Sequence, residues 1–254
     1  MEEKKLAGLE PGAVFEYFEA LCAIPHGSHN TKAISDFLVD FAKKQQIRYI
    51  QDESNNIILF ADGTCGLEDH EPVVLQGHMD MVCEKDEGCP IDMDTQGLDL
   101  CHDNLCVFAK GTTLGGDDGI AVAYAMALIA DRTIPHPPLE VIITVDEEVG
   151  MLGADVIDVS MLKGRKMINL DSEDEGIFTV ACAGGATATI SLNVNRKAVY
   201  GPCVRLCVDG LRGGHSGAEI HKNRANANKV LFRFLYEAPC EVLLASVDGG
   251  GLRN

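Results

Sequence analysis

An α/β fold is what this sequence predicts: a mostly parallel sheet with helices on both faces, followed by a smaller, partial α+β unit. Up to about residue 187, short apolar runs of strand length alternate with amphipathic helical patterns, which is typical of parallel sheets covered on both faces. Beyond that point, strand patterns with alternating apolar and polar residues surround a single helix. We therefore expect two domains, at residues 1–187 and 188–254.

The first half of the leading domain should contain two helices and three strands. Apolar residues recur at helical spacing over residues 12–24 and 31–42. The expected strands are short and apolar, and they lie at about 48–51, 56–61 and 72–77. Residues 83–110 show no firm period, so we expect loops there.

Helices and strands continue to alternate in the second half of that domain. The expected order is a helix over 117–131, a strand at 139–145, a short helix around 151–158 and a strand at 167–170. In the second domain, the runs ATATISLNVN, CVRLCVDG and EVLLASVDG are typical of strands, and a helix is expected from about 217 to 236.

The charge balance and the lengths of the apolar runs argue against several classes of protein. The chain has 21 Lys and Arg residues against 39 Asp and Glu residues, a formal net charge of −18. This charge argues against binding to nucleic acid or to anionic membrane surfaces, both of which need basic patches. No apolar run reaches the ~18 residues of a membrane span, and the N-terminus does not resemble a secretory signal. The ten cysteines are therefore expected to stay reduced in a cytoplasmic protein.

Metal-type ligands follow three of the apolar runs. PVVLQG leads into His78 and Asp80, LEVIITV into Glu147 and Glu148, and KMINL into Asp171. A further pair, Asp117-Asp118, stands in GTTLGGDDG at the expected start of a helix. Ligands bind at the carboxyl ends of strands in open α/β sheets, so these side chains are expected to share one site.

Each of these clusters also has a purely structural interpretation. His78 and Asp80 would suit a surface pair at a strand end, and Glu147 and Glu148 a solvated acidic turn. Asp117 would suit helix capping, since the helix dipole favours a negative charge there. A phosphate-binding loop is a rival interpretation of the glycine-rich run, but the GK[ST] ending of such loops is missing. Taken jointly, the ligands favour a dinuclear site with nitrogen and oxygen donors, able to polarise a carbonyl and activate a water.

Five ordered motifs resemble one known family. GHMDMV, GTTLGGDDGIAVA, TVDEEVGMLGA, NLDSEDEG and GGHSG are similar, in order and spacing, to motifs of the cytosolic aminoacyl-histidine dipeptidases. This family belongs to the co-catalytic dinuclear-zinc peptidases and deacylases. The resemblance implies a zinc-peptidase-like catalytic domain over 1–187 and an incomplete lid and dimerisation domain over 188–254.

The resemblance also implies a role for each site residue. His78 and Asp171 would bind one metal, Glu148 the second, and Asp117 would bridge the two. Asp80 would orient His78, and Glu147 would act as general base. His215 in GGHSG would reach the substrate carbonyl or carboxylate from the lid.

The expected activity is metal-dependent hydrolysis of dipeptides, Xaa-His among them, by a metal-activated water with Glu147 as the base. Two Zn²⁺ ions are expected, with Co²⁺ or Mn²⁺ as alternatives; the expected partners are a small peptide substrate and a second copy of the chain. Family members have a further His ligand in a C-terminal segment, and no histidine of this chain matches it. We therefore expect an N-terminal part of such an enzyme. The alternatives are a related tripeptidase, deacylase or carboxypeptidase, or an inactive metal-binding or dimerisation fragment.

Overall fold

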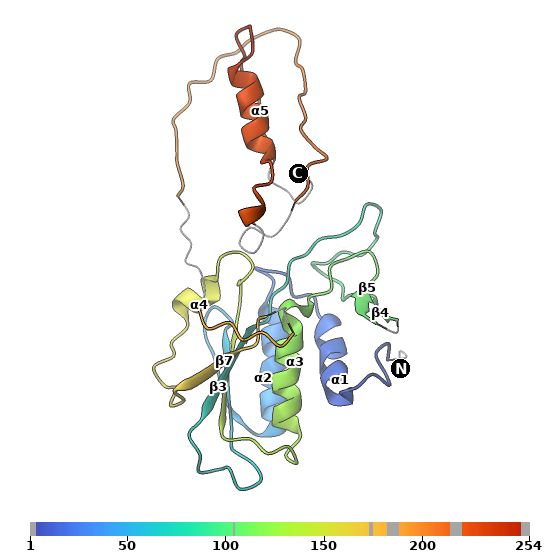
Figure 1. Cartoon of the computed structure of the whole chain (residues 1–254), viewed down its shortest axis with the longest axis vertical. Coiled ribbons are helices and arrows are strands. Elements are labelled where there is room, and N and C mark those ends of the chain that lie inside the picture. The colour runs from blue at the N-terminus through green and yellow to red at the C-terminus, as the bar shows by residue number, and fades with distance from the viewer. Residues whose placement is uncertain (1–3, 104, 173–174, 182–187, 214–219, 250–254) are drawn as a thin grey trace. The chain divides into compact units, whose positions relative to one another are not determined.

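The computed structural model describes residues 4–103, 105–172, 175–181, 188–213 and 220–249. The chain divides into two compact units, Met1–Ala183 and Gly184–Asn254, which are described one at a time below (Figure 1).

The first unit is built on a five-stranded sheet. Its strands are β1 (Arg48–Gln51), β2 (Ile57–Ala61), β3 (Val73–His78), β6 (Leu139–Thr144) and β7 (Lys166–Asn169), in the spatial order β1-β2-β6-β3-β7. Strand β3 pairs in parallel with both β6 and β7, whereas β2 is antiparallel to both of its neighbours. Strand β2 alone therefore runs against the other four, and the prediction of a mostly parallel sheet is confirmed.

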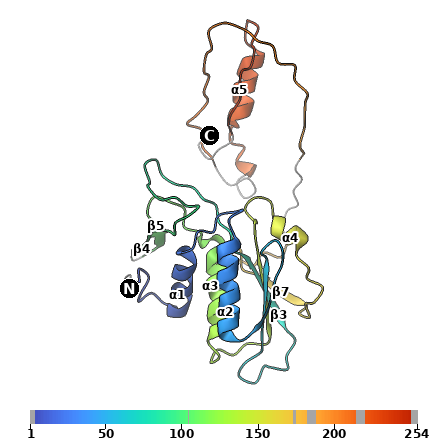
Figure 2. The same ribbon diagram turned by 180° about the vertical axis from the view of Figure 1, so that it is seen from behind.

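Helices lie on both faces of the sheet, as predicted. Helices α2 (Lys32–Gln45) and α3 (Gly116–Ala130) pack on one face of the sheet, and α1 (Gly12–Cys22) packs against α3 on the side away from the strands. The short α4 (Leu152–Val156) lies on the other face (Figures 1 and 2). The expected helix and strand positions in this unit agree with these elements to within a few residues.

The core lies between the sheet and the three long helices. Leu59, Leu75 and Val141 are aligned across β2, β3 and β6, and all three are buried in the core. All six residues of β6 are buried because this strand is central and covered on both faces. Strand β7 forms the sheet edge, and its four residues are exposed.

Two short strands of this unit were not predicted. Residues 83–110 were expected to form loops, but β4 (Leu100–His102) pairs antiparallel with β5 (Val107–Ala109) in a separate two-stranded sheet. Each strand has three residues, which is too few for an alternating pattern to be recognised in the sequence. None of the described helices is both long and apolar enough to cross a membrane.

The described part of the second unit differs from its prediction. It contains a 3₁₀ turn, η1 (Ile220–Lys222), and helix α5 (Ala227–Tyr236), but no strand. The strands expected at 203–210 and 241–249, and over the described part of 186–195, are therefore wrong. Their apolar residues are largely exposed, as Ile190 and Leu192 show, and an extended segment forms a strand only when another backbone pairs with it.

The start of the last helix also needs correction. The sequence predicts a helix from about 217, whereas the described residues become α-helical only at Ala227. The side chain of Asn226 accepts a hydrogen bond from the Lys229 backbone N–H at 2.9 Å. Asn226 is therefore the N-cap, a position that asparagine favours strongly.

Candidate metal centre

Three neighbouring parallel strands deliver the predicted ligands to one edge of the sheet. His78 is the last residue of β3, Glu147 and Glu148 follow β6 by a short turn, and Asp171 comes two residues after β7. Asp117 and Asp118 stand in the first turn of α3, which packs on β3. Because β6, β3 and β7 run the same way, their carboxyl ends meet there.

His78 is fully buried and held by both ring nitrogens. Its Nδ1 lies 2.9 Å from the main-chain oxygen of Asp80, and its Nε2 lies 3.0 Å from Oδ1 of Asp117. Burial acts to lower the pKa of the imidazole, but hydrogen bonds to Asp117 and Asp80 outweigh it and raise the pKa to about 11. Nδ1 is thus engaged with the backbone, whereas Nε2 faces the carboxylates.

Asp80 is a buried carboxylate that ties three chain segments together. Its side chain accepts hydrogen bonds from the Glu147 N–H at 3.0 Å, the Glu148 N–H at 3.4 Å and the Ser28 hydroxyl at 2.8 Å. Burial acts to raise the pKa of Asp80, but His78 and these donors lower it below its usual value. Asp80 is therefore an ionised acceptor that fixes the turn after β6.

The two aspartates at the start of α3 have different environments. The side chain of Asp117 is half-exposed and faces His78, whereas Asp118 is buried and accepts the His78 backbone N–H at 3.2 Å through Oδ2. The peptide bond between them is cis. The pKa of Asp118 is raised to about 7, chiefly by burial; the charge of His78 acts to lower it and the charge of Asp171 acts to raise it.

Asp118 fits beside β3 only because residue 77 is glycine. A Cβ atom added at Gly77 would lie 2.5 Å from Asp118 Oδ2 and 3.1 Å from the Ala121 Cβ. The first of these distances is far inside van der Waals contact, so another residue at this position would displace the carboxylate.

Glu147 and Glu148 are only partly buried and lie near the other acids. Burial raises the pKa of both carboxyl groups, and Asp117 raises both further while His78 lowers them. Oε2 of Glu147 is 3.9 Å from Nε2 of His78. Both groups therefore hold a proton more readily than an exposed glutamate does.

Three overlapping triads in the described residues have the proximity that a metal ion requires. The members of each triad offer ligand atoms within 4.8 Å of one another, and the triads are His78–Asp117–Glu148, His78–Glu147–Asp171 and Asp117–Asp118–Asp171. Mutual repulsion and burial keep the pKa values of several of these acids raised, which is the condition that a divalent cation relieves. Imidazole and carboxylate donors together suit Zn²⁺ or a similar ion, so the residues fit a metal centre.

The structure thus brings together six of the seven predicted site residues: His78, Asp80, Asp117, Glu147, Glu148 and Asp171. The seventh, His215, lies outside the described residues. Sequence reasoning assigned no role to Ser28 or Gly77, and it noted Asp118 only as the partner of Asp117. Ser28 carried no signal, because it lies in a loop 52 positions away from Asp80.

The chain is similar in sequence and fold to known peptidases. The chain is 39% identical to the cytosol non-specific dipeptidase of Escherichia coli in an alignment 254 positions long, which covers 98% of this chain and 52% of that protein. A solved aminoacylhistidine dipeptidase from Vibrio alginolyticus superposes with a TM-score of 0.67 at 33% identity, covering 91% of this chain and 48% of that one. No family model matches.

A more distant structure agrees in fold alone. Aminopeptidase PepT from Bacillus cereus superposes with a TM-score of 0.54 at 22% identity, over 64% of this chain and 43% of that one. The chain spans about half the length of the curated relatives that it matches over most of its own length. Over more than nine-tenths of its length, the chain is therefore similar to the E. coli and V. alginolyticus dipeptidases, and it resembles the aminoacyl-histidine dipeptidases in sequence and in fold.

Proposed function

We propose that this chain carries the metal-binding catalytic part of a dipeptidase that hydrolyses the single peptide bond of its substrate, with Xaa-His dipeptides among those accepted. The observation that carries the proposal is the convergence of one histidine and several carboxylates at the carboxyl ends of β3, β6 and β7. The names of the similar proteins support peptides as the substrate class.

In this proposal, His78, Asp117, Glu148 and Asp171 would hold two Zn²⁺ ions, and Asp117 would be shared by both. Bound there, such ions would polarise the peptide carbonyl and lower the pKa of a water molecule toward neutrality. Asp80 keeps the His78 ring oriented through its backbone oxygen, a common device for ligating histidines. Co²⁺ or Mn²⁺ would suit the same donors.

Glu147 is proposed to be the general base, taking a proton from the attacking water and passing it to the leaving amine. Two features support this role. Its backbone N–H is fixed by Asp80, which positions the side chain, and burial raises the pKa of its carboxyl above the usual value, as suits a general base. Glu147 is also partly exposed, with 31% of its side-chain surface accessible, so a substrate can reach it.

The remaining parts of the proposal rest on the family resemblance. Residues 1–187 would form the catalytic domain and 188–254 part of a lid through which two copies of the chain pair. Large apolar side chains of α5, such as Phe232 and Phe234, are exposed and would suit such pairing. His215 would stabilise the oxyanion from this lid, and the cytoplasm would be the site of action.

The test measures metal content and hydrolysis on the same preparation. The chain, loaded with Zn²⁺, is assayed with Ala-His, other dipeptides, a tripeptide and an N-acetyl amino acid. Glu147→Ala should reduce dipeptide hydrolysis by about 10²–10⁴-fold while keeping the wild-type metal content, and Glu148→Ala should lose metal. Metal loss in Glu147→Ala would contradict its role, and preference for the tripeptide or the acetylated compound would favour the related activities. Two bound metals without any hydrolysis would favour an inactive fragment.

A further inference from the structure

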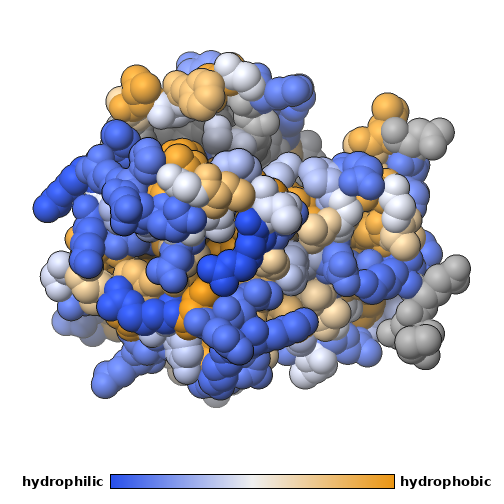
Figure 3. All heavy atoms as spheres, turned by 90° about the horizontal axis from the view of Figure 1, so that it is seen from below, coloured by the Kyte–Doolittle hydropathy of each residue, from blue (hydrophilic) through white to orange (hydrophobic). Residues whose placement is uncertain are grey.

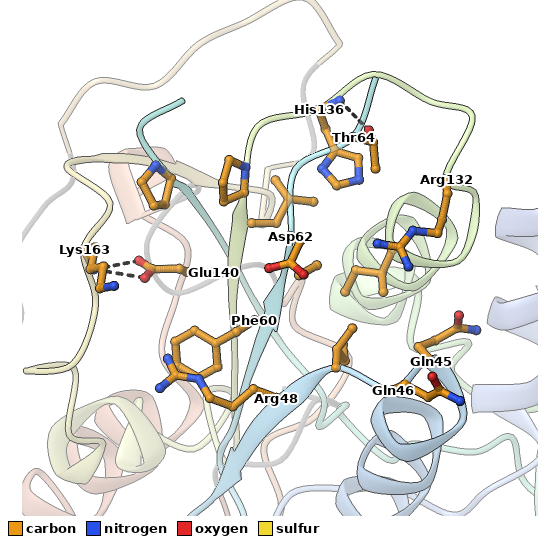
Figure 4. A pocket seen from close by; sticks show the side chains of 16 residues that line it. Gln45, Gln46, Arg48, Phe60, Asp62, Thr64, Arg132, His136, Glu140 and Lys163 are labelled. Atoms are coloured by element: carbon orange, nitrogen blue, oxygen red, sulfur yellow. Dashed lines mark hydrogen bonds between the residues drawn. The ribbon is translucent and has the colours of Figure 1, made fainter. Parts of the chain in front are cut away.

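A hollow in the surface lies at the end of the sheet opposite to the metal-ligand cluster. Its volume is about 490 Å³, large enough for a small molecule. It lies between the C-terminal ends of α2 and α3, the start of β1 and the end of β2, and the start of β6 (Figure 4). In the space-filling view from below, mostly hydrophilic residues cover this end of the molecule, with apolar residues visible between them (Figure 3).

Two arginines contribute positive charge to this hollow. The guanidinium of Arg48 lies 3.5 Å from the centroid of the Phe60 ring, which holds it in place by a cation–π contact. Arg132 follows the end of α3 and extends toward the middle of the hollow (Figure 4). Within the described residues, neither arginine has a carboxylate within 4 Å.

The hollow also contains negative groups, only one of which is available to a ligand. Glu140 is buried and accepts the backbone N–H groups of Lys163 and Gly164 at 2.9–3.0 Å. Asp62 is exposed and extends into the hollow facing Arg132 (Figure 4). Asp62 and Arg132 form no ion pair with each other, and Asp62 forms no ion pair with any other described residue.

The electrostatic setting favours a ligand with both charges over a simple anion. Helices α2 and α3 both end at this hollow, and the C-terminal end of a helix favours a positive charge. An anion would therefore gain from the arginines but would be opposed by the helix ends and by Asp62. A ligand with one carboxylate and one ammonium group meets a suitable partner at each end.

From these observations we infer that the hollow binds a small zwitterion of the α-amino acid class. The ligand's carboxylate contacts the guanidinium of Arg132, with Arg48 nearby, and its ammonium group contacts Asp62. Ile47, Ile129 and Leu139 also line the hollow, so an aliphatic side chain on the ligand has apolar contacts. The site is separate from the metal centre, and its ligand binding does not depend on the proposed hydrolysis.

The test uses L-leucine and two analogues that each lack one charge. N-acetyl-leucine has no ammonium group, and leucinamide has no carboxylate. Binding to the intact chain is followed by ligand-observed NMR titration in excess EDTA, so that neither metal binding nor peptide hydrolysis affects the result. Leucine should bind at least about threefold more tightly than either analogue, as expected for losing one partly exposed charge pair.

Variants assign each charge to its partner. Asp62→Asn should abolish the preference for leucine over N-acetyl-leucine, and Arg132→Gln should abolish the preference over leucinamide. Arg196→Gln and Asp248→Asn, at exposed positions of the second unit, should leave all three affinities unchanged, and circular dichroism checks that each variant is folded. Equal affinity for the three compounds, unchanged preferences in Asp62→Asn and Arg132→Gln, or no saturable binding up to about 50 mM leucine would each overturn the inference.

Discussion

Gly77→Ala is the most direct test of how the metal centre is built. Gly77 precedes His78 in β3, and an added Cβ would lie 2.5 Å from Asp118 Oδ2 and 3.1 Å from the Ala121 Cβ. The neighbouring chain cannot absorb this methyl group without a shift, because α3 is packed against β3. We expect the Asp118 carboxylate to move away and to weaken its hydrogen bond with the His78 backbone N–H.

The size of the effect follows from two contributions. Overpacking a well-packed core by one methyl group costs about 1–3 kcal/mol. Weakening the hydrogen bond from the His78 N–H to Asp118, now 3.2 Å long, adds part of the roughly 1.5–3 kcal/mol of a hydrogen bond to a charged group. The free energy of unfolding of the metal-free protein should therefore fall by about 2–4 kcal/mol. Metal affinity should also fall, because Asp117 shares the displaced turn.

Urea unfolding measures this decrease in the free energy of unfolding. It is followed by circular dichroism because the chain has no tryptophan for fluorescence. Gly12→Ala is the matched control, because a Cβ there would meet only Glu10 oxygens at 3.9–4.0 Å, and its unfolding free energy should stay within about 0.5 kcal/mol of the wild type. If Gly77→Ala matched Gly12→Ala in both stability and zinc affinity, the proposed dependence of Asp118 on this glycine would be refuted.

Three further predictions concern single contacts. Ser28→Ala removes the 2.8 Å hydrogen bond to Asp80 and should lower zinc affinity about tenfold in a chelator competition assay; Ser28→Thr, which keeps the hydroxyl, should restore it. Burial raises the pKa of Asp118 to about 7, whereas an unfolded aspartate titrates near ~3.9, so this group should make the metal-free protein less stable as the pH rises from about 4 to about 7. Asp118→Asn should flatten that part of the pH profile, and an unchanged slope would contradict the assignment. Glu140→Gln replaces a buried carboxylate that accepts hydrogen bonds from two backbone N–H groups, those of Lys163 and Gly164, and should lower the free energy of unfolding in urea by about 1–2 kcal/mol. The exposed control Glu71→Gln should change it by less than about 0.5 kcal/mol.

Much of the metal centre could be predicted because parallel strands share an edge. His78, Glu147 and Asp171 each follow an apolar run, and a parallel arrangement of β3, β6 and β7 is enough to bring them together. The spacing of apolar residues along the sequence likewise predicted the positions of the helices and of the sheet strands in the first unit.

The sequence could not indicate which contacts fix the ligands. GGDDG shows two adjacent aspartates, but only packing against Gly77 makes Asp118 the buried one and leaves Asp117 facing His78. Ser28 reaches Asp80 through a loop whose position depends on the tertiary structure. In the second unit, alternating apolar residues such as Ile190 and Leu192 predicted strands, yet an alternating pattern does not supply a pairing partner.

Asp80 explains how the ligand cluster is ordered before any metal binds. Its carboxylate joins the loop after α1, the end of β3 and the turn after β6 through Ser28, His78 and the backbone of Glu147 and Glu148. The positions of both glutamates are thus set by their main-chain N–H groups and not by their own side chains. Removing the Glu147 carboxylate leaves that backbone contact with Asp80 intact. The turn should therefore keep presenting Glu148 to a metal when Glu147 is truncated, which is the physical reason to expect that base and ligand roles can be separated by mutation.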